Sequence, residues 1–130
     1  TYTDPEIAHV GMNETEALGK YPQKAKILRW GYAENDRARA ERRTDGMVKL
    51  ITHKNGRILG CSIVGQGAGE MISLFAYAIA NKQKVGSLMK FVAPYPTLTE
   101  MAKRVAVEHY RDSLKSPWIG RWLGFIRKLP

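Results

Sequence analysis

The sequence contains a single cysteine, Cys61, among its 130 residues. One thiol cannot form an internal disulfide, a redox dithiol pair or a multi-thiolate metal site, so a reducing, cytoplasmic location is expected. Cys61 stands within an apolar segment and is predicted to be a buried small hydrophobe rather than a nucleophile. The three histidines, His9, His53 and His109, are far apart and lack i, i+4 spacing. We therefore expect no metal site, and predict that they lie on the surface or pack beside helices.

Long apolar runs are also missing, because the longest, residues 71–80, is about half of the ~20 residues that a membrane-spanning helix requires. The N-terminus shows no initiator methionine, basic leader or apolar signal stretch, which is the pattern expected of an excised segment. No Gly-x-Gly-x-x-Gly fingerprint of dinucleotide binding follows a strand-like segment. The composition that remains, 44% hydrophobic and 25% charged, is that of one globular domain. Its net charge of +9 makes anionic partners an open alternative.

Alternating apolar residues predict strands in the first half of the chain. Asn55-Gly56 joins two of them and predicts a β-hairpin with a type I′ turn. The last strand is apolar on both faces, which predicts a central strand covered on two sides. In the second strand, Lys26 is expected to continue the apolar face into solvent. The predicted strands span residues 6–12, 24–32, 47–54 and 57–64.

Helical spacing of apolar residues follows in the second half. The order of elements predicts an α+β fold, in which an antiparallel sheet carries helices packed on it. Residues 35–43 are rich in arginine and acid and predict a solvated loop or one short helix. The predicted helices are a brief one capped by Asn13 or Thr15, then 70–81, 85–90 and 98–111, with a loop at 91–96.

Three segments together resemble the dimerisation (interface) domain of the pyridine nucleotide-disulfide oxidoreductases, the family of glutathione reductase, dihydrolipoamide dehydrogenase and mercuric reductase. They occur in the family's order and spacing and cover roughly residues 1–110. We therefore expect a dimerisation domain at 1–112 and a separate basic tail at 113–130. The segments are Tyr2-Thr3-Asp4-Pro5-Glu6-Ile7 with Val10-Gly11; residues 46–50 and 57–60 followed by 63–65 and 68–72; and Pro94-Tyr95-Pro96-Thr97-Leu98-Thr99-Glu100.

The resemblance implies a homodimer in which the loop containing Tyr95 completes the partner subunit's flavin and disulfide site. It implies FAD and NAD(P)H as cofactors of the full-length enzyme, both bound by domains that are absent here, so this fragment alone is expected to bind neither and to be inactive. It assigns catalytic positions to Tyr95 and Glu100. It assigns flavin contact to Tyr95 and Pro96, joined by a cis peptide bond that aims the Tyr95 carbonyl at the flavin ring.

Tyr95 departs from the family pattern, because it stands where the disulfide reductases carry a histidine that exchanges protons with the substrate thiol. A phenol with a pKa near ~10 stays protonated at neutral pH and cannot serve as a ready base. Mercuric reductases carry tyrosine at this position, so a similar enzyme is implied, although the chain ends without their vicinal cysteine pair. We expect Tyr95 to be a hydrogen-bond donor or a packing group. The acceptor of the electrons stays open.

The sequence leaves open two possible roles for Glu100. Thr97 and Glu100 form a capping box, in which Glu100 reaches back to the start of the helix and Thr97 accepts from the Glu100 amide. The alternative is a hydrogen bond between Glu100 and Tyr95. One reading is structural, and the other places Glu100 in the site.

Two basic regions support rival functions. Residues 116–130 predict a cationic amphipathic helix that packs on the dimer or on the missing domains, with peripheral attachment to a membrane surface as the alternative. The arginines at 29, 37, 39, 42 and 43 permit a small nucleic-acid-binding module. Acids between these arginines dilute the patch, so we expect no nucleic-acid partner.

Overall fold

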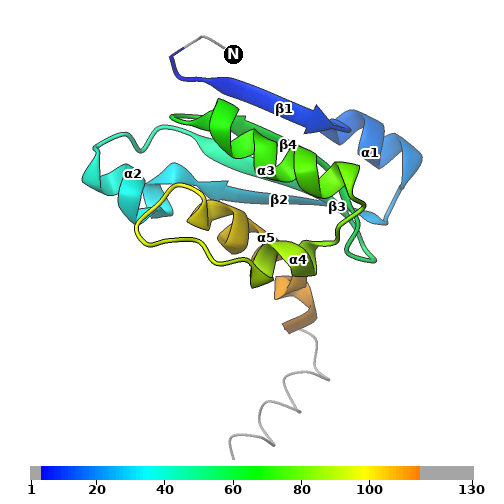
Figure 1. Ribbon diagram of the computed structural model, residues 1–130. Helices are drawn as coiled ribbons and strands as arrows, with labels where there is room; N and C mark the ends of the chain where they lie inside the picture. Colours follow the sequence, from blue (N-terminus) through cyan, green and yellow to red (C-terminus); the bar gives the residue numbers. More distant parts are fainter. Residues whose placement is uncertain (1–3, 115–130) are drawn as a thin grey trace, which may run out of the picture.

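The computed structural model describes the backbone of residues 4–114 and the side chains of residues 4–111. Its centre is a four-stranded antiparallel sheet in the order β1-β4-β3-β2, with helices packed on it, as the α+β prediction required (Figure 1). β4 lies between β1 and β3, so the expectation of a central strand is confirmed. The strands are β1 (Ile7–Gly11), β2 (Ala25–Gly31), β3 (Met47–His53) and β4 (Ile58–Val64).

The hairpin between β3 and β4 forms as predicted, but its turn is not type I′. The His53 amide donates to the Arg57 carbonyl over 2.8 Å, which leaves a three-residue loop. Within that loop only Gly56 has a positive φ, 97°, whereas a type I′ turn requires two such residues. The Asn55 side chain accepts from the Arg57 amide over 2.9 Å and stabilises the longer turn.

The helices cover the two faces of the sheet unequally. α3 (Ala68–Ala80) packs on β1 and β4, and α5 (Glu100–Leu114) packs on β2 and β3, with α4 (Val85–Lys90) against α5. Their buried side chains form the main core with one face of the sheet. On the opposite face α1 (Glu14–Lys20) covers only one end, through a small cluster of Ala17, Ile51 and Leu59. The chain therefore leaves part of this second face open.

The open part of the second face carries apolar side chains. Ile7 is 55% exposed, Met47 41% and Val64 38%, and the three lie in register on neighbouring strands. The central strand was expected to be covered on both faces, but the described residues cover only one end of this second face. An exposed apolar surface of this kind is typical of a site that another surface covers.

Several local predictions are corrected in detail. Residues 35–43 contain the one short helix that was an alternative there, α2 (Asp36–Ala40), and the preceding η1 (Tyr32–Glu34) was not predicted. Lys26 does not extend into solvent, because its ammonium donates to the His109 carbonyl over 2.9 Å beneath α5. α3 begins at Ala68 and α5 at Glu100, each two residues from its predicted start, because the caps of these helices depend on neighbouring loops. The predicted tail helix lies outside the described residues.

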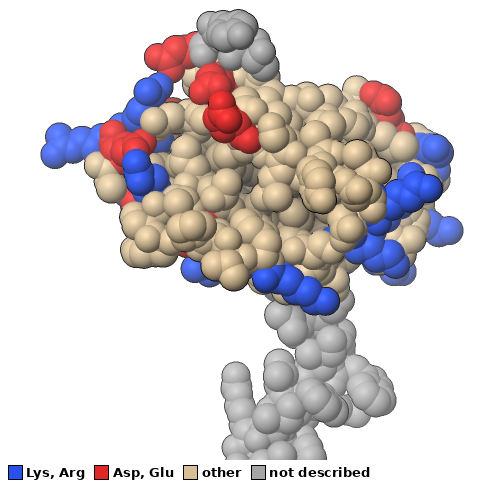
Figure 2. Space-filling view, viewed as in Figure 1, with Lys and Arg blue, Asp and Glu red and all other residues tan. Residues whose placement is uncertain are grey.

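The charged side chains are unevenly distributed (Figure 2). Around α2 both signs are mixed, whereas blue side chains gather at the opposite end, where α1 and the β3–β4 turn lie in Figure 1. Three arginines of the suspected nucleic-acid patch form ion pairs, Arg29 with Glu14, Arg37 with Glu41 and Arg43 with Asp4. Such pairing reduces the positive field that a nucleic acid would need.

Candidate functional site

The loop between α4 and α5 carries the residues that the sequence singled out, and it lies beside α2 (Figure 1). Its side chains project outward, since Val92 is 88% exposed and Tyr95 70%. The Tyr95-Pro96 peptide bond is cis, as expected. The loop therefore presents Tyr95 and Pro96 at the surface, where a second molecule could contact both.

The Tyr95 hydroxyl is directed at the first residue of α2. It donates a hydrogen bond to Oδ2 of Asp36 over 2.7 Å. This hydrogen bond and the charge of Asp36 raise the pKa of Tyr95, with a smaller contribution from the charge of Glu100. The phenol is therefore held in its protonated form at neutral pH, which excludes a general base and suits a hydrogen-bond donor.

The side chain of Asn35 connects the loop to α2 through two hydrogen bonds. Its Oδ1 accepts from the Ala38 amide over 2.9 Å and caps α2, while its Nδ2 donates to the Thr97 carbonyl over 3.0 Å. The side chain is only 5% exposed, so both bonds are sheltered from water. One amide thus joins two segments that lie 62 residues apart.

Sequence reasoning missed Asn35 and Asp36 as site residues. The signal that existed was local: an asparagine before a short polar segment is a common N-cap. That signal could predict the start of a helix but not its contact with the loop, because both contacts depend on how the sheet brings β2 beside α5.

Of the two interpretations of Glu100, the structure forms the structural one, a contact with the backbone before α5. Its Oε1 accepts from the Thr97 amide over 3.3 Å, which is one half of the expected capping box. The Thr97 hydroxyl instead donates to the Pro94 carbonyl over 2.6 Å, so it holds the loop rather than the helix. The alternative bond to Tyr95 is not formed, because that hydroxyl is bonded to Asp36.

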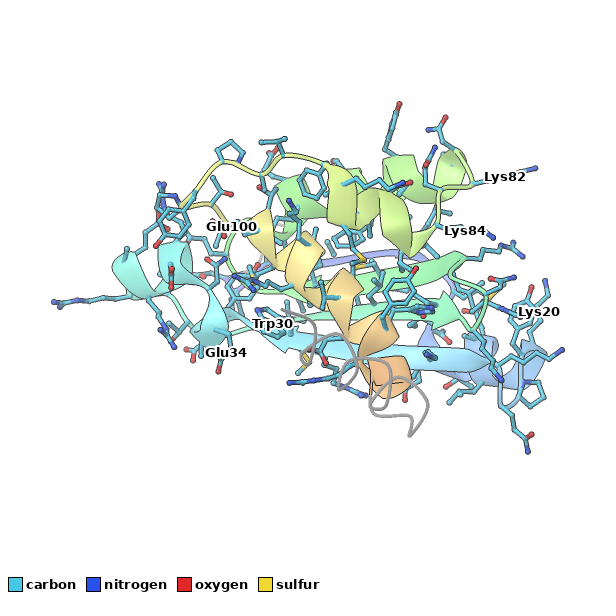
Figure 3. The ribbon with its side chains drawn as sticks, turned by 90° about the horizontal axis from the view of Figure 1, so that it is seen from below. Lys20, Trp30, Glu34, Lys82, Lys84 and Glu100 are labelled. Carbon is cyan, nitrogen blue, oxygen red and sulfur yellow. The ribbon has the colours of Figure 1, made fainter. Side chains whose placement is uncertain are left out.

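A small cavity of about 240 Å³ lies between α2 and the start of α5. Three acidic residues and one arginine are among the residues that line it. In Figure 3, Trp30, Glu34 and Glu100 lie toward the same end of the molecule. The lining residues are Trp30, Glu34, Asn35, Asp36, Glu100 and Arg104.

The remaining candidates do not join this site. Cys61 is buried, as predicted, and burial raises the pKa of its thiol. His109 is also buried, with Nδ1 2.8 Å from the Thr52 hydroxyl, whereas His9 is exposed and bonds Ser62. Among residues 4–111, no three histidine, cysteine or acidic side chains are grouped as a metal site would require. In the same part of the chain no helix is long and apolar enough to cross a membrane.

Comparison with known families decides what this arrangement is. A model of the pyridine nucleotide-disulphide oxidoreductase dimerisation domain matches residues 1–106. The chain belongs to this family. Dihydrolipoyl dehydrogenase of mouse mitochondria is 40% identical over 100 residues, which are 76% of this chain and 19% of that protein; the human protein is 38% identical over 100 residues. The chain thus spans about a fifth of the length of the curated relatives it matches.

Solved structures show the same fold. LpdA of Mycobacterium tuberculosis superposes with a TM-score of 0.76 at 28% identity, over 82% of this chain and 23% of that one. A Cu(II) complex of the flavoprotein disulfide reductase RclA from Escherichia coli gives a TM-score of 0.77 at 23% identity, over 82% and 24%. These match the expected interface-domain fold.

Membership of a dimerisation-domain family explains why the surface has apolar groups in two places. The loop exposes Val92 and Tyr95, and the open sheet face exposes Ile7, Met47 and Val64. Burial of such side chains against other surfaces is the main favourable term in most protein association. These two exposed apolar surfaces are therefore suited to burial against a partner molecule.

Proposed function

We propose that this domain forms the homodimer of a full-length FAD-dependent, NAD(P)H-linked oxidoreductase, and that its loop completes the flavin and disulfide site of the partner subunit. The observation that carries the proposal is the exposed Tyr95, held by Asp36 on a loop that Asn35 fixes to the domain. A side chain that must act on another subunit has to be both exposed and fixed in position.

The residues of this chain fit an edge of the flavin rather than its whole binding site. Tyr95 and Pro96 stand outward on the loop, where the Tyr95 carbonyl and the proline ring could cover one side of the flavin. Flavin, when bound, carries electrons between the nicotinamide and the disulfide. The contribution of this chain is to exclude water from that site and to place a hydroxyl near it.

Tyr95 has a defined protonic role in this proposal. With its pKa raised, the phenol cannot remove a proton from a thiol, but it can donate to a thiolate or a similar anion. Its single hydrogen is directed at Asp36, so donation across the dimer requires that this bond open. Asp36 therefore opposes the donor role and keeps Tyr95 oriented until the partner's group is in place.

For the electron acceptor, we propose a mercuric-reductase-like specificity on the strength of the tyrosine at the position of the family's histidine. The relatives named above are dihydrolipoyl dehydrogenases, so lipoamide is the second candidate. Oxidation of NADPH and NADH by the full-length enzyme, measured with mercuric ion and with lipoamide, separates the two. Turnover with lipoamide alone would refute the mercuric assignment.

The first test of dimerisation is the solution mass of the 130-residue chain by sedimentation or light scattering. A dimer has twice the 14.7 kDa of one chain. A stable monomer at micromolar concentration would contradict the role of this domain as a sufficient dimer interface.

The test of the hydroxyl is Tyr95→Phe in the full-length enzyme. A hydrogen bond to a charged group is worth about 1.5–3 kcal/mol, so kcat should fall roughly 10- to 100-fold with KM for the nicotinamide unchanged. Tyr77→Phe is the matched control, because Tyr77 is 68% exposed on α3. Equal activity of the two variants would show that the hydroxyl has no such role.

A further inference from the structure

A cavity of about 680 Å³ lies at the end of the domain opposite α2. It is lined by residues of α1, of the β3–β4 turn and of the segment that joins α3 to α4, and it shares no residue with the loop of Tyr95. In Figure 3, Lys82 and Lys84 lie at this end of the molecule, and Glu34 and Glu100 lie at the other. A cavity of this volume has the size of a binding site for a small organic molecule.

Three cations line the cavity, and their charge is not neutralised. Arg57, Lys82 and Lys84 are all exposed, and none of them forms an ion pair with another side chain of the described residues. The one acid in the lining is Glu16, so three cations and one acid give the lining a net charge of +2. An excess of positive charge around a cavity favours an anionic ligand.

Backbone contacts hold two of these cations next to each other. Arg57 forms a β-bridge with Lys84, and the Val85 amide donates to the Gly56 carbonyl over 2.9 Å. The β3–β4 turn is thereby joined to the segment before α4. The guanidinium of Arg57 also donates to the Tyr21 hydroxyl over 3.3 Å, which restricts its position. The two charges therefore stay close together although they come from different parts of the sequence.

Lys82 occupies a backbone position that favours glycine. Its φ is 54°, and it follows the residue that caps the end of α3. The Lys82 amide donates to the Ile79 carbonyl over 3.1 Å, and the Gln83 amide donates to the Ala78 carbonyl over 2.8 Å. These two bonds form a Schellman motif, in which glycine is the usual residue with positive φ. Lysine is less favourable than glycine there, and it adds a cation to the cavity.

Two side-chain amides in the lining offer donors to a ligand. Oδ1 of Asn55 accepts from the Arg57 amide over 2.9 Å, and Oε1 of Gln83 accepts from the Ser87 hydroxyl over 2.6 Å. Within the described residues, neither of the two NH₂ groups forms a hydrogen bond. The lining thus combines three cations with two free amide donors, which is a set that suits the acceptor oxygens of an anion.

The charge and the donors fit a phosphate monoester. At neutral pH such a group carries a charge of about −1.5 to −2 and has three strong acceptor oxygens, whereas one carboxylate carries a single charge. Because one water molecule takes up about 30 Å³, a cavity of about 680 Å³ holds far more than a phosphate group. The organic part of an ester can therefore occupy the remainder, beside the partly exposed side chains of Met12 and Ile79.

We propose that this cavity binds a small phosphate monoester, such as a sugar phosphate or a nucleoside monophosphate. The three cations contact the phosphate oxygens, and the amides of Asn55 and Gln83 donate the remaining hydrogen bonds. The cavity and the loop of Tyr95 lie at opposite ends of the domain, so a bound ester leaves that loop accessible. The proposal is independent of the role of Tyr95 and of the electron acceptor.

Isothermal titration calorimetry of the 130-residue chain at constant ionic strength measures the binding. The probes are ribose 5-phosphate, glucose 6-phosphate and adenosine monophosphate, compared with inorganic phosphate and with the dicarboxylate succinate. We expect at least one ester to bind with a Kd roughly tenfold or more below those of inorganic phosphate and succinate, because its organic part adds contacts within the cavity. If no ester binds more tightly than these two ions, the proposal is wrong.

Two pairs of substitutions separate the cavity from the positive field around it. The test pair is Arg57→Gln with Lys84→Gln, and the control pair is Lys24→Gln with Lys54→Gln. Lys24 and Lys54 are exposed and joined by a backbone hydrogen bond of 2.7 Å, but they do not line the cavity. The test pair should raise the Kd roughly a hundredfold, because each charge-assisted hydrogen bond lost costs about tenfold. The control pair should change it much less, and equal losses would overturn the site and indicate diffuse attraction of anions.

Two single substitutions exclude unfolding as the cause of lost binding. Lys82→Gly should raise the Kd about tenfold while Tm stays unchanged or rises, because glycine adopts the positive φ without strain. Glu16→Gln should lower the Kd, because it removes the one acid from the lining. An unchanged Kd in either variant would contradict binding of the phosphate in this cavity.

Discussion

Replacement of Asn35 by alanine tests the connection between α2 and the loop of Tyr95. The change removes the cap of α2, which costs about 1 kcal/mol. It also removes the donor to the Thr97 carbonyl, a buried hydrogen bond worth about 1 kcal/mol. The sum is about 2 kcal/mol, or a fall in Tm of roughly 6–10 °C for a domain of this size.

Asn35→Asp separates the two contributions. Aspartate keeps an oxygen that can cap α2 through the Ala38 amide but has no NH₂ group to donate to Thr97. Thermal unfolding should therefore place the aspartate variant between the parent and Asn35→Ala. Hydrogen exchange should be faster in residues 94–99 of both variants, because the loop has lost its tether. If Asn35→Asp unfolds like the parent and its loop is equally protected, the tether to Thr97 contributes nothing and the argument fails.

Three further changes test other parts of the domain. Gly60→Ala should lower the free energy of unfolding in chemical denaturation by about 3 kcal/mol, because the added Cβ would lie 2.0 Å from the Met12 carbonyl oxygen. Gly86→Ala in α4 is the control, because its Cβ meets no atom within 4 Å and the change should be neutral or stabilising. Similar free energies of unfolding for the two variants would contradict the packing around Gly60. Burial, and then the charge of Lys26, lower the pKa of His109, so stability should be complete above the unfolded pKa of about 6.5 and decline as pH falls through the lower folded value. In His109→Gln this decline should shrink, and an identical pH dependence would assign it to other groups. Asp36→Asn should lower the pKa of Tyr95 toward its ordinary range. Ultraviolet titration of Asp36→Asn, minus that of the double variant Asp36→Asn with Tyr95→Phe, isolates the signal of Tyr95. An unchanged pKa would show that Asp36 does not raise it.

The hydrogen bond between Asp36 and Tyr95 joins residues 59 positions apart, and a sequence pattern could not predict it. Nothing in the order of residues links position 36 to position 95, and near the loop the sequence predicted the capping box of Thr97 and Glu100. The structure forms half of that box and directs the Tyr95 hydroxyl elsewhere. Side chains that choose between a neighbour and a distant partner are decided by which atoms the fold brings within about 3 Å.

The sequence by itself determined the elements whose signals are local. Alternation of apolar residues placed the four strands, helical spacing placed α3, α4 and α5, and Gly56 marked the hairpin, because each depends on residues within a few positions of one another. The three segments that resemble the family, taken together, were sufficient to indicate it, and the cis peptide bond was anticipated with them.

Tertiary structure alone decided the contacts that make the candidate sites. It brought Asn35 and Asp36 to the loop of Tyr95 and placed Lys26 under α5. The physical reason is that a sheet fixes the relative positions of segments tens of residues apart. Hydrogen bonds and charges then act between those segments over a few ångströms, a distance that sequence separation does not encode.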